Sequence, residues 1–228
     1  MNNKLADEFF EALGEPKLEH PFSLIDAYRF NLCYQHLLPG SVLDVGAYMG
    51  DFLKLAQKDG REAYGSEINQ ARISLVNSIL GSQLVKLGFR NGNLDDFDSD
   101  SVDNVVCMET VEHIIDDKYA ISELCRVAGK RVIVTVPYRE RVEQILCTHC
   151  NEFTPNHGHQ HSYDKGSFAA MLPPGWQVLV EYSFANRITR MIRKILPESR
   201  AMIPIMSMVD RITPGSGRWL MIVLDSNV

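Results

Sequence analysis

Short apolar runs that alternate with helical patterns are the feature that most constrains the fold of this chain. The apolar runs predict strands, and the first five lie at 41–45, 62–66, 84–87, 102–108 and 131–136. Helical patterns occur between them, near 50–58, 69–80 and 116–128. Regular alternation of strands and helices favours a mostly parallel sheet with helices on both faces. The strands read as continuous apolar runs, which is typical of strands covered on both sides.

Two later strand candidates, 176–183 and 218–225, complete the expected sheet. A chain of 228 residues is long enough for one substantial α/β domain. We therefore predict a single domain over 1–228 with a doubly wound, mostly parallel sheet. Three additions to this domain are expected: an N-terminal helical lead-in at 1–40, a Cys/His insert at 139–166 and a basic amphipathic insert at 184–214.

Charge and composition exclude several classes of function. The net charge of −6 argues against a general nucleic-acid-binding surface, so no nucleic acid is expected as a partner. No apolar run approaches the ~20 residues that a membrane span needs. The first residues lack the basic and then apolar pattern of a signal peptide. We expect a cytoplasmic protein, with association to a membrane surface as an alternative that depends on the basic insert.

The stretch SVLDVGAYMGDFLKLAQ combines a strand, a glycine turn and the start of a helix. Ligands of open α/β sheets bind at the carboxyl ends of the strands, and Asp44 ends this one. Gly46 permits a tight turn, and Gly50 opens the next helix. A dinucleotide pyrophosphate needs a middle glycine, whereas this chain has Tyr48 there and Asp51 at the helix start. A nicotinamide oxidoreductase is therefore disfavoured.

The segments that follow this turn occur in a specific order. The second strand ends in YGSEINQ, which places Glu67 at its tip, where an acid can accept the hydroxyls of a ribose. Next come RNGNLDDF, SVDNVVCMETVEHIID and ELCRVAGKRVIVTVP. As an ordered set over residues 40–137, these motifs resemble the class I S-adenosylmethionine-dependent methyltransferases, in particular their type 11 small-molecule branch.

The resemblance implies a Rossmann-like, seven-stranded fold whose last strand is antiparallel, and S-adenosylmethionine as the cofactor. It also implies a set of cofactor-binding residues: Asp44, Gly46, Tyr48, Gly50, Glu67, Ile68, Asn93, Leu94 and Glu109. Glu67 would hold the ribose, Ile68 would pack on the adenine, and Asn93 and Leu94 match positions at the adenine edge. Tyr48 and Asn93 depart from the family pattern, which has glycine and aspartate there. A degenerate fold that binds no cofactor is the alternative.

The segment METVEHIID places Glu109, Glu112 and His113 where their side chains can meet, at the carboxyl end of the fourth strand. Glu112 and His113 are our candidate catalytic residues, and three roles stay open. The pattern E-x-x-E-H is similar to that of ubiquinone-biosynthesis O-methyltransferases, where it ligates a divalent cation that would lower the pKa of a substrate hydroxyl. His113 could instead act as a general base. Both side chains could also simply buttress the turn.

The segment CTHCNEFTPNHGHQHSY contains two cysteines at the spacing of a zinc site, followed by histidines. It resembles an insert found in some type 11 methyltransferases, and we assign Cys147, Cys150, His159 and His161 as zinc ligands, with His157 as an alternative to His161. A structural zinc would staple an insert with little apolar content. The alternatives are a catalytic zinc, or thiols and histidines of a lid without metal. A disulfide is disfavoured in a reducing compartment.

The basic insert at 184–214 carries six basic and two acidic residues. Within 187–196, apolar residues recur at helical spacing between arginines and a lysine, so a cationic amphipathic helix is predicted. Such a helix could contact a membrane surface and suit a lipid-linked substrate. We favour the simpler interpretation, in which it packs on its own domain or on a homodimer partner. A connection this long predicts a substrate lid or an interface.

Together these observations predict an enzyme, an S-adenosylmethionine-dependent methyltransferase that acts on an O, N or C atom of a small-molecule or lipid-linked acceptor. Positioning the acceptor in line with the methyl group would supply most of the rate. The alternative function is a catalytically silent module that binds the cofactor or zinc and acts through protein partners.

Overall fold

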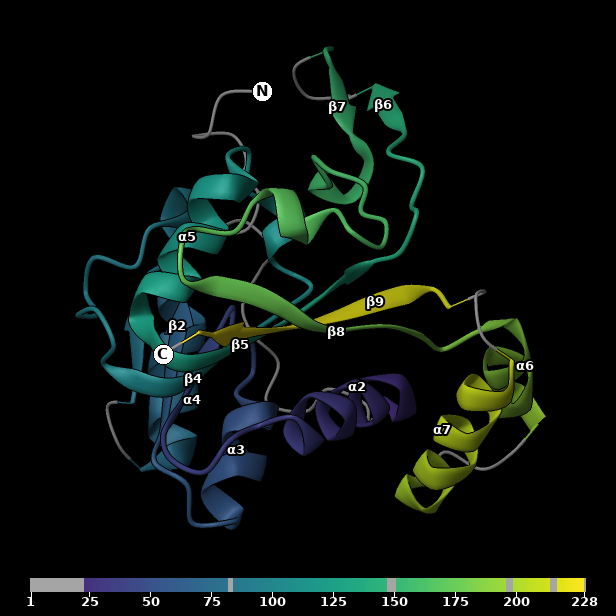
Figure 1. The fold of residues 1–228 in the computed structure, drawn as a ribbon, viewed down its shortest axis with the longest axis horizontal. Helices are drawn as coiled ribbons and strands as arrows, with labels where there is room; N and C mark the ends of the chain where they lie inside the picture. Colours follow the sequence, from purple (N-terminus) through teal and green to yellow (C-terminus); the bar gives the residue numbers. More distant parts are fainter. Residues whose placement is uncertain (1–22, 82–83, 147–150, 196–198, 214–216, 228) are drawn as a thin grey trace.

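The protein is built around one seven-stranded sheet (Figure 1). The computed structural model describes residues 23–81, 84–146, 151–195, 199–213 and 217–227. The strand order is β3-β2-β1-β4-β5-β9-β8. The strands are β1 (Val42–Val45), β2 (Ala63–Glu67), β3 (Val85–Leu87), β4 (Val102–Met108), β5 (Ala128–Pro137), β8 (Trp176–Phe184) and β9 (Trp219–Ser226). Strands β1 to β5 pair in parallel, whereas β9 runs antiparallel to β5 and to β8. The doubly wound, mostly parallel sheet with an antiparallel last strand is confirmed.

Helices α3, α4 and α5 connect the strands where the sequence predicts them, whereas α7 was not predicted. The α-helices are α2 (Leu24–Gln35), α3 (Asp51–Lys58), α4 (Gln70–Leu80), α5 (Asp117–Val127), α6 (Arg187–Ile195) and α7 (Ile203–Ile212). Short 3₁₀ turns are η1 (Arg90–Gly92), η2 (Val111–His113), η3 (Asn156–Gly158), η4 (Phe168–Ala170) and η5 (Arg200–Met202). A hairpin of β6 (Gln144–Leu146) and β7 (Phe153–Pro155), which the sequence pattern does not indicate, lies within the Cys/His insert. The division into one domain with three additions stays a prediction.

The sheet is covered on both faces, and each face has its own apolar core. Side chains alternate along a strand, so Val105 and Cys107 of β4 join the core under α5, whereas Val106 joins the opposite core. That second core is formed with α2, α3, α4 and α7. The alternation explains why both faces of these strands are apolar in the sequence.

Helices α6 and α7 lie together at one end of the molecule, beyond the sheet (Figure 1). We call α6, η5 and α7 the α6–α7 module. It is fixed by the buried carboxylate of Asp210, which accepts hydrogen bonds from the Tyr28 hydroxyl of α2 at 2.9 Å, from the Thr189 hydroxyl of α6 at 2.7 Å and from the Ala185 amide at 2.6 Å. Among the described residues, no helix is both long and apolar enough to span a membrane.

Candidate active site

A large open cavity lies at the carboxyl ends of the parallel strands. Its volume is about 2150 Å³, well above the ~300–1,000 Å³ of common small-ligand pockets, so it has room for more than one ligand. Of the residues that the sequence assigns to the site, these line it: Asp44, Gly46, Tyr48, Glu67, Ile68, Glu109 and His113. The structure thus brings the ends of β1, β2 and β4 to one space.

The turn after β1 needs its glycines. Gly46 has a φ of +79°, and a Cβ there would lie 2.3 Å from the Thr110 hydroxyl oxygen. Gly50 has a φ of +71°, and its Cβ would lie 2.6 Å from a methyl carbon of Val76. Gly50 therefore sets the packing of α3 against α4 and does not line the cavity. The backbone can approach a ligand closely at Gly46 because no side chain intervenes.

Tyr48 occupies the position where the family pattern has a glycine. Its φ of +46° is unfavourable for a residue with a Cβ and is typical of functional sites. The residue is 52% exposed, and the Arg72 guanidinium carbon lies 4.6 Å from the centre of its ring. The Tyr48 ring therefore forms the rim of the cavity, held by a cation–π contact with α4.

Two carboxylates dominate the electrostatics of this turn. Asp44 is 2% exposed, and burial raises its pKa to about 7, with further contributions from Glu67 and Asp51. Glu67 accepts hydrogen bonds from the backbone amides of Tyr48 and Ile68, both at 2.9 Å, which fix its orientation. Such a site is suited to a ligand that brings a positive charge to Asp44 and hydroxyl groups to Glu67.

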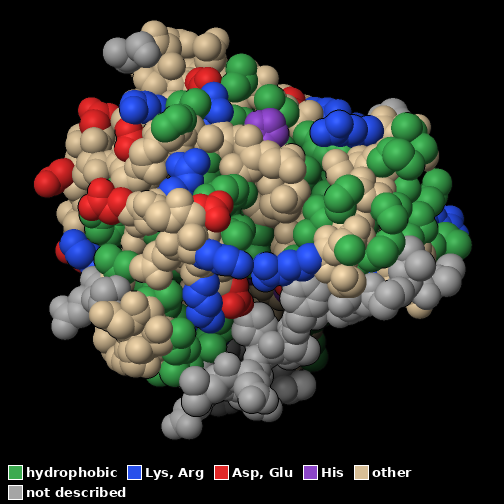
Figure 2. Space-filling view, turned by 90° about the horizontal axis from the view of Figure 1, so that it is seen from below, with side chains coloured by type: hydrophobic (Ala, Val, Ile, Leu, Met, Phe, Trp, Pro, Cys, Tyr) green, Lys and Arg blue, Asp and Glu red, His purple; other side chains and the backbone are tan. Residues whose placement is uncertain are grey.

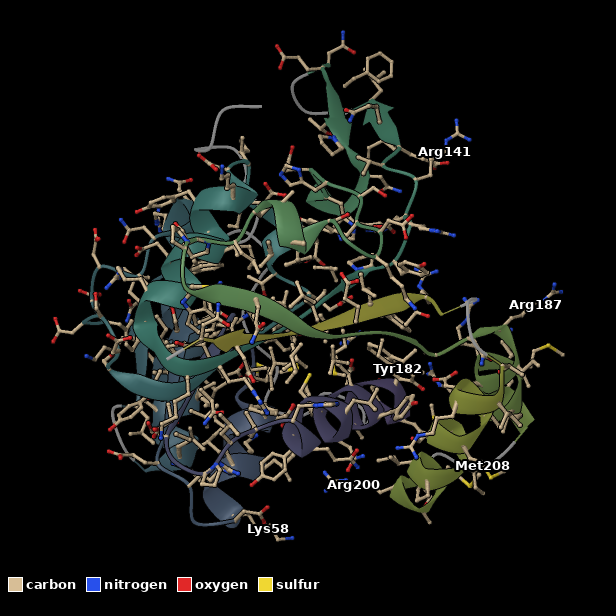
Figure 3. All side chains as sticks on the ribbon, viewed as in Figure 1. Lys58, Arg141, Tyr182, Arg187, Arg200 and Met208 are labelled. Carbon is tan, nitrogen blue, oxygen red and sulfur yellow. The ribbon has the colours of Figure 1, made fainter. Side chains whose placement is uncertain are left out.

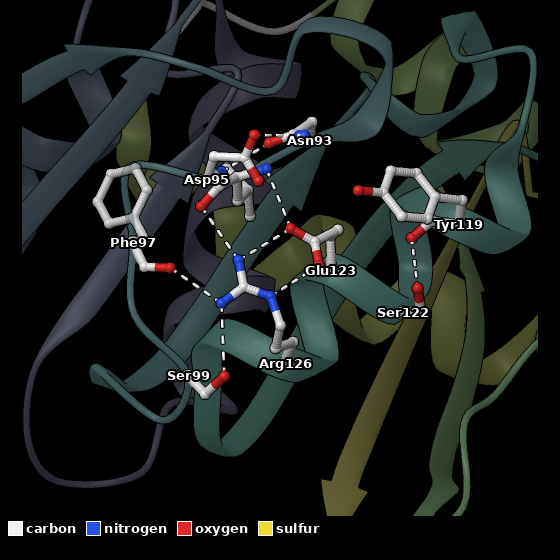
Figure 4. Close-up of polar contacts among 9 residues, drawn as sticks. Asn93, Asp95, Phe97, Ser99, Tyr119, Ser122, Glu123 and Arg126 are labelled. Carbon is white, nitrogen blue, oxygen red and sulfur yellow. Dashed lines mark hydrogen bonds and ion pairs between the residues drawn. The ribbon is translucent and has the colours of Figure 1, made fainter.

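The adenine-edge assignment at Asn93 and Leu94 stays a prediction. The Asn93 side chain donates to Asp95 at 2.8 Å and accepts from the Asp95 amide at 2.6 Å (Figure 4). Leu94 is buried, and its amide donates to Glu123. Neither residue lines the cavity, whereas Phe89 and Ile68 do and offer it apolar surface.

Glu109 lies at the end of β4 in a left-handed conformation, with a φ of +51°. Its carboxylate is 3.5 Å from an Arg29 guanidinium nitrogen and accepts a hydrogen bond from Thr135 at 3.2 Å. Burial raises the pKa of Glu109, and Arg29 opposes this shift. Arg29 of α2 lines the cavity and was missed by the sequence reasoning. A signal was present, because Arg29 interrupts the otherwise apolar buried face of α2.

Glu112 and His113 lie on η2 and not on a regular helix, and they meet His159 of the Cys/His insert. One ligand atom from each lies within 4.8 Å of the others. Glu112 is 1% exposed, and its Oε2 has no hydrogen-bond partner within the described part of the chain. Nδ1 of His159 contacts the Glu140 carboxylate. The sequence pattern did not predict that His159 lies beside η2, because this contact depends on how the insert folds back onto the domain.

Burial shifts the pKa values of Glu112 and His113 in opposite directions. Burial lowers the pKa of His113 to about 4, and the neighbouring His159 adds to the shift. Burial also raises the pKa of Glu112 well above its usual range, with Glu109 as the next contribution. The neutral His113 imidazole beside the buried Glu112 carboxyl group could accept a divalent cation, which would favour the ionised form of Glu112.

The predicted zinc site stays a prediction, because Cys147 and Cys150 lie outside the described residues. Nε2 of His161 is 2.8 Å from the Ile114 carbonyl oxygen, and its Nδ1 is 3.5 Å from Asp117. His161 therefore ties the insert to the start of α5, whereas His159 turns toward η2.

Part of the cavity wall comes from the α6–α7 module. Its lining residues are Arg200, Ile203, Pro204, Ser207, Met208 and Arg211. Figure 3 places Lys58 of α3, Arg200 of η5 and Met208 of α7 along the same lower side of the molecule. The part of the lining that the α6–α7 module contributes therefore combines apolar surface with cations.

Comparisons with known proteins agree with this geometry. A family model described as a methyltransferase domain matches residues 20–174. The fold is similar to an S-adenosylmethionine-dependent methyltransferase from Archaeoglobus fulgidus, with a TM-score of 0.61 and 16% identity over 99% of this chain and 100% of that chain. A similar enzyme from Mesorhizobium loti gives a TM-score of 0.62 and 11% identity, over 89% of this chain and 100% of that one.

A probable chloroplastic tocopherol O-methyltransferase of Oryza sativa subsp. japonica is 34% identical over 103 residues. The match covers 42% of this chain and 28% of that protein, so the chain spans just over a quarter of the length of this relative.

Proposed function

The chain belongs to the methyltransferase-domain family and has the class I fold of S-adenosylmethionine-dependent enzymes. On that premise, we propose that it methylates an oxygen atom of an amphiphilic acceptor. The wider class, methyl transfer to an O, N or C atom of a small-molecule or lipid-linked compound, contains this proposal. Similarity to a relative named as a tocopherol O-methyltransferase supports oxygen as the acceptor atom.

The residues of the turn fit the cofactor. Asp44 is a buried carboxylate whose raised pKa would fall beside a positive charge, and S-adenosylmethionine carries such charges. Glu67 is held by backbone amides in an orientation that suits the ribose hydroxyls. Ile68 and Phe89 offer apolar surface to the adenine. When bound, the cofactor supplies an electrophilic methyl group on a sulfonium.

The observation that carries the proposal is the shared cavity. Asp44 and Glu67 line one part of it, and Ile203, Met208 and Arg211 line another. An apolar wall with cations at its mouth suits an acceptor that has an apolar body and a polar or anionic end. The chain then acts mainly by positioning the acceptor oxygen and excluding water.

Activation of the acceptor hydroxyl is proposed at Glu112, His113 and His159. A pKa of about 4 makes His113 a weak general base near neutral pH, where a pKa closer to 7 is most effective. The three residues would hold a divalent cation, which would lower the pKa of a bound hydroxyl. The Glu140 carboxylate at Nδ1 of His159 would orient that ring, as carboxylates behind metal-ligating histidines do.

The cation is tested by binding of Co²⁺ or Zn²⁺ measured by calorimetry. The experiment uses a Cys147→Ser/Cys150→Ser background, so that thiolate sites do not contribute. One cation should bind to this protein, and Glu112→Gln and His159→Ala should each weaken it at least tenfold. His161→Ala is the matched control and should bind the cation normally. Equal affinity for the cation in all four proteins would contradict a cation site at Glu112, His113 and His159.

Methyl transfer itself is tested with methyl-labelled S-adenosylmethionine and host extract, separated into lipid, aqueous and macromolecular fractions. Label in the lipid fraction, accompanied by S-adenosylhomocysteine, is the expected result. Tight cofactor binding without any S-adenosylhomocysteine would favour the silent module instead. Label confined to the aqueous or macromolecular fraction would contradict the amphiphilic acceptor.

A further inference from the structure

The α6–α7 module exposes an unusual amount of apolar surface. Among the described residues, its exposed large apolar side chains are Ile188 (47%), Met191 (54%), Ile205 (43%), Met208 (59%) and Ile212 (69%). Figure 2 shows hydrophobic side chains gathered at this end of the molecule. Single exposed apolar residues need no explanation, but a group of them on two neighbouring helices indicates an interaction surface.

Within the described residues of the module, the charge around these side chains has one sign. Basic residues of the module are Arg187, Arg190, Arg193, Lys194, Arg200 and Arg211. Asp210, its one acid within the described residues, is 2% exposed and accepts hydrogen bonds from Tyr28 and Thr189. The described surface of the module therefore presents cations and apolar groups without an exposed acid. This combination is typical of helices that lie in the interface of an anionic membrane.

The same surface borders the cavity. Met208 is the second most exposed of the five apolar residues and also lines the cavity, and the exposed Arg211 does so as well. A bilayer that contacts the module would thus lie against the cavity mouth. An amphiphilic acceptor could enter from the lipid without crossing bulk water.

We propose that the α6–α7 module docks on an anionic phospholipid surface and that the acceptor is taken from that surface, an inference that rests on the methyl transfer proposed above. The apolar side chains enter the boundary between head groups and acyl chains. The arginines and the lysine pair with the anionic head groups.

A second copy of the chain fits this surface less well. A two-fold interface places the same patch of both subunits against itself. Here it would bring cations against cations, and the described part of the module offers no exposed acid to compensate. Charge complementarity therefore favours an anionic lipid over a homodimer.

The test is sedimentation of the full chain with vesicles of phosphatidylcholine, with and without phosphatidylglycerol. The protein should sediment with the anionic vesicles and be released by salt. Arg187→Gln/Lys194→Gln should weaken binding more than tenfold, since each cation near the surface contributes about fivefold. Met191→Gln/Ile212→Gln should also weaken binding to the anionic vesicles. None of these four residues lines the cavity.

Matched controls come from surfaces outside the module. Leu146→Gln/Phe153→Gln removes two exposed apolar residues of the β6–β7 hairpin, and Lys118→Gln/Lys165→Gln removes two exposed lysines. Both controls should bind vesicles like the unchanged protein, and circular dichroism of all variants should be the same.

Several results would overturn the proposal. One is equal binding of the protein to neutral and anionic vesicles, and another is unchanged vesicle binding by both module variants. A third is a dimer in analytical ultracentrifugation that the Met191→Gln/Ile212→Gln substitutions dissociate, in a protein that binds no vesicles. The vesicles contain neither cofactor nor acceptor. A protein that does not bind them therefore does not contradict the proposed methyl transfer, and a protein that transfers no methyl group does not contradict vesicle binding.

Discussion

A carboxylate as deeply buried as Asp44 is costly in its charged form unless a positive charge lies beside it. The pKa of about 7 expresses this cost, and a cofactor bound at Asp44 as proposed should have an affinity that depends on pH. A cationic ligand binds the ionised form, so its affinity should rise as pH increases toward 7 and fall as pH decreases. In the absence of ligand, the same raised pKa favours the folded state at low pH, an advantage that fades as pH rises from about 4 to about 7.

We predict that S-adenosylmethionine binds roughly tenfold more weakly at pH 5.5 than at pH 7, because only a few per cent of Asp44 is ionised at the lower pH. The amino group of the ligand stays protonated in this range. Calorimetric titration at both pH values measures the effect. Asp44→Asn should bind weakly and without this slope, and a flat profile for the unchanged protein would contradict the assigned role.

Gly46→Ala tests the close approach at the turn. A positive φ costs about 1–2 kcal/mol for alanine, and the contact with Thr110 adds to it, so the free energy of unfolding should fall by about 2–3 kcal/mol. Cofactor binding should also be lost. Gly60→Ala is the matched control, because Gly60 has a φ of +75° and nothing within 4 Å of its added Cβ. This control should lose only the backbone cost of about 1–2 kcal/mol and retain cofactor affinity. Urea unfolding and calorimetry measure both effects.

At the residue scale, the sequence predicted which side chains at the ends of the strands lie at the ligand-binding edge of the sheet. Asp44, Glu67 and Glu109 line the cavity because the carboxyl ends of parallel strands converge there. Arg29 and His159 could not be predicted in the same way. Arg29 reaches Glu109 because α2 crosses the sheet face, and His159 reaches Glu112 because the insert folds back. Such contacts depend on tertiary packing and leave no periodic signal.

At the scale of elements, periodicity located the strands of the main sheet and helices α3, α4, α5 and α6 to within a few residues, but it missed α7. It did not indicate that Glu112 and His113 lie on a 3₁₀ turn, since the left-handed residue Glu109 precedes it and α5 begins only at Asp117. The β6–β7 hairpin was missed as well, because its three-residue strands are too short for an alternating pattern.

The attachment of the α6–α7 module rests on one buried carboxylate. Asp210→Asn keeps the shape of the side chain but removes its charge and replaces one acceptor oxygen with a donor. We expect the free energy of unfolding to fall by about 3 kcal/mol, because hydrogen bonds to charged groups are each worth about 1.5–3 kcal/mol. Tyr28→Phe, which removes one of these bonds, should cost about 1–2 kcal/mol. Urea unfolding measures both, and equal stability of the three proteins would contradict this anchoring role.

On the scale of the whole molecule, the cavity joins two parts of the chain that differ in character. The sheet ends supply carboxylates, where we propose that the cationic cofactor binds, and the module supplies cations and apolar surface. Because the rest of the chain carries the acidic excess, a membrane would attract one end of the molecule and repel the other. The molecule would therefore approach a bilayer in one orientation, with the cavity mouth toward the lipid.

This orientation predicts how the docking surface affects turnover. Arg187→Gln/Lys194→Gln should raise the apparent KM for the acceptor in the membrane fraction of host extract about tenfold and leave kcat unchanged, because docking precedes the chemical step. Once detergent has dispersed the same fraction, the variant and the unchanged protein should have equal KM, since no anionic surface remains to concentrate the enzyme. Transfer of label from S-adenosylmethionine measures both conditions. A KM difference that persists in detergent would show that these residues take part in acceptor binding itself. A lower kcat of the variant in both the membrane fraction and the detergent-dispersed fraction would show that the substitutions disturb the cavity wall.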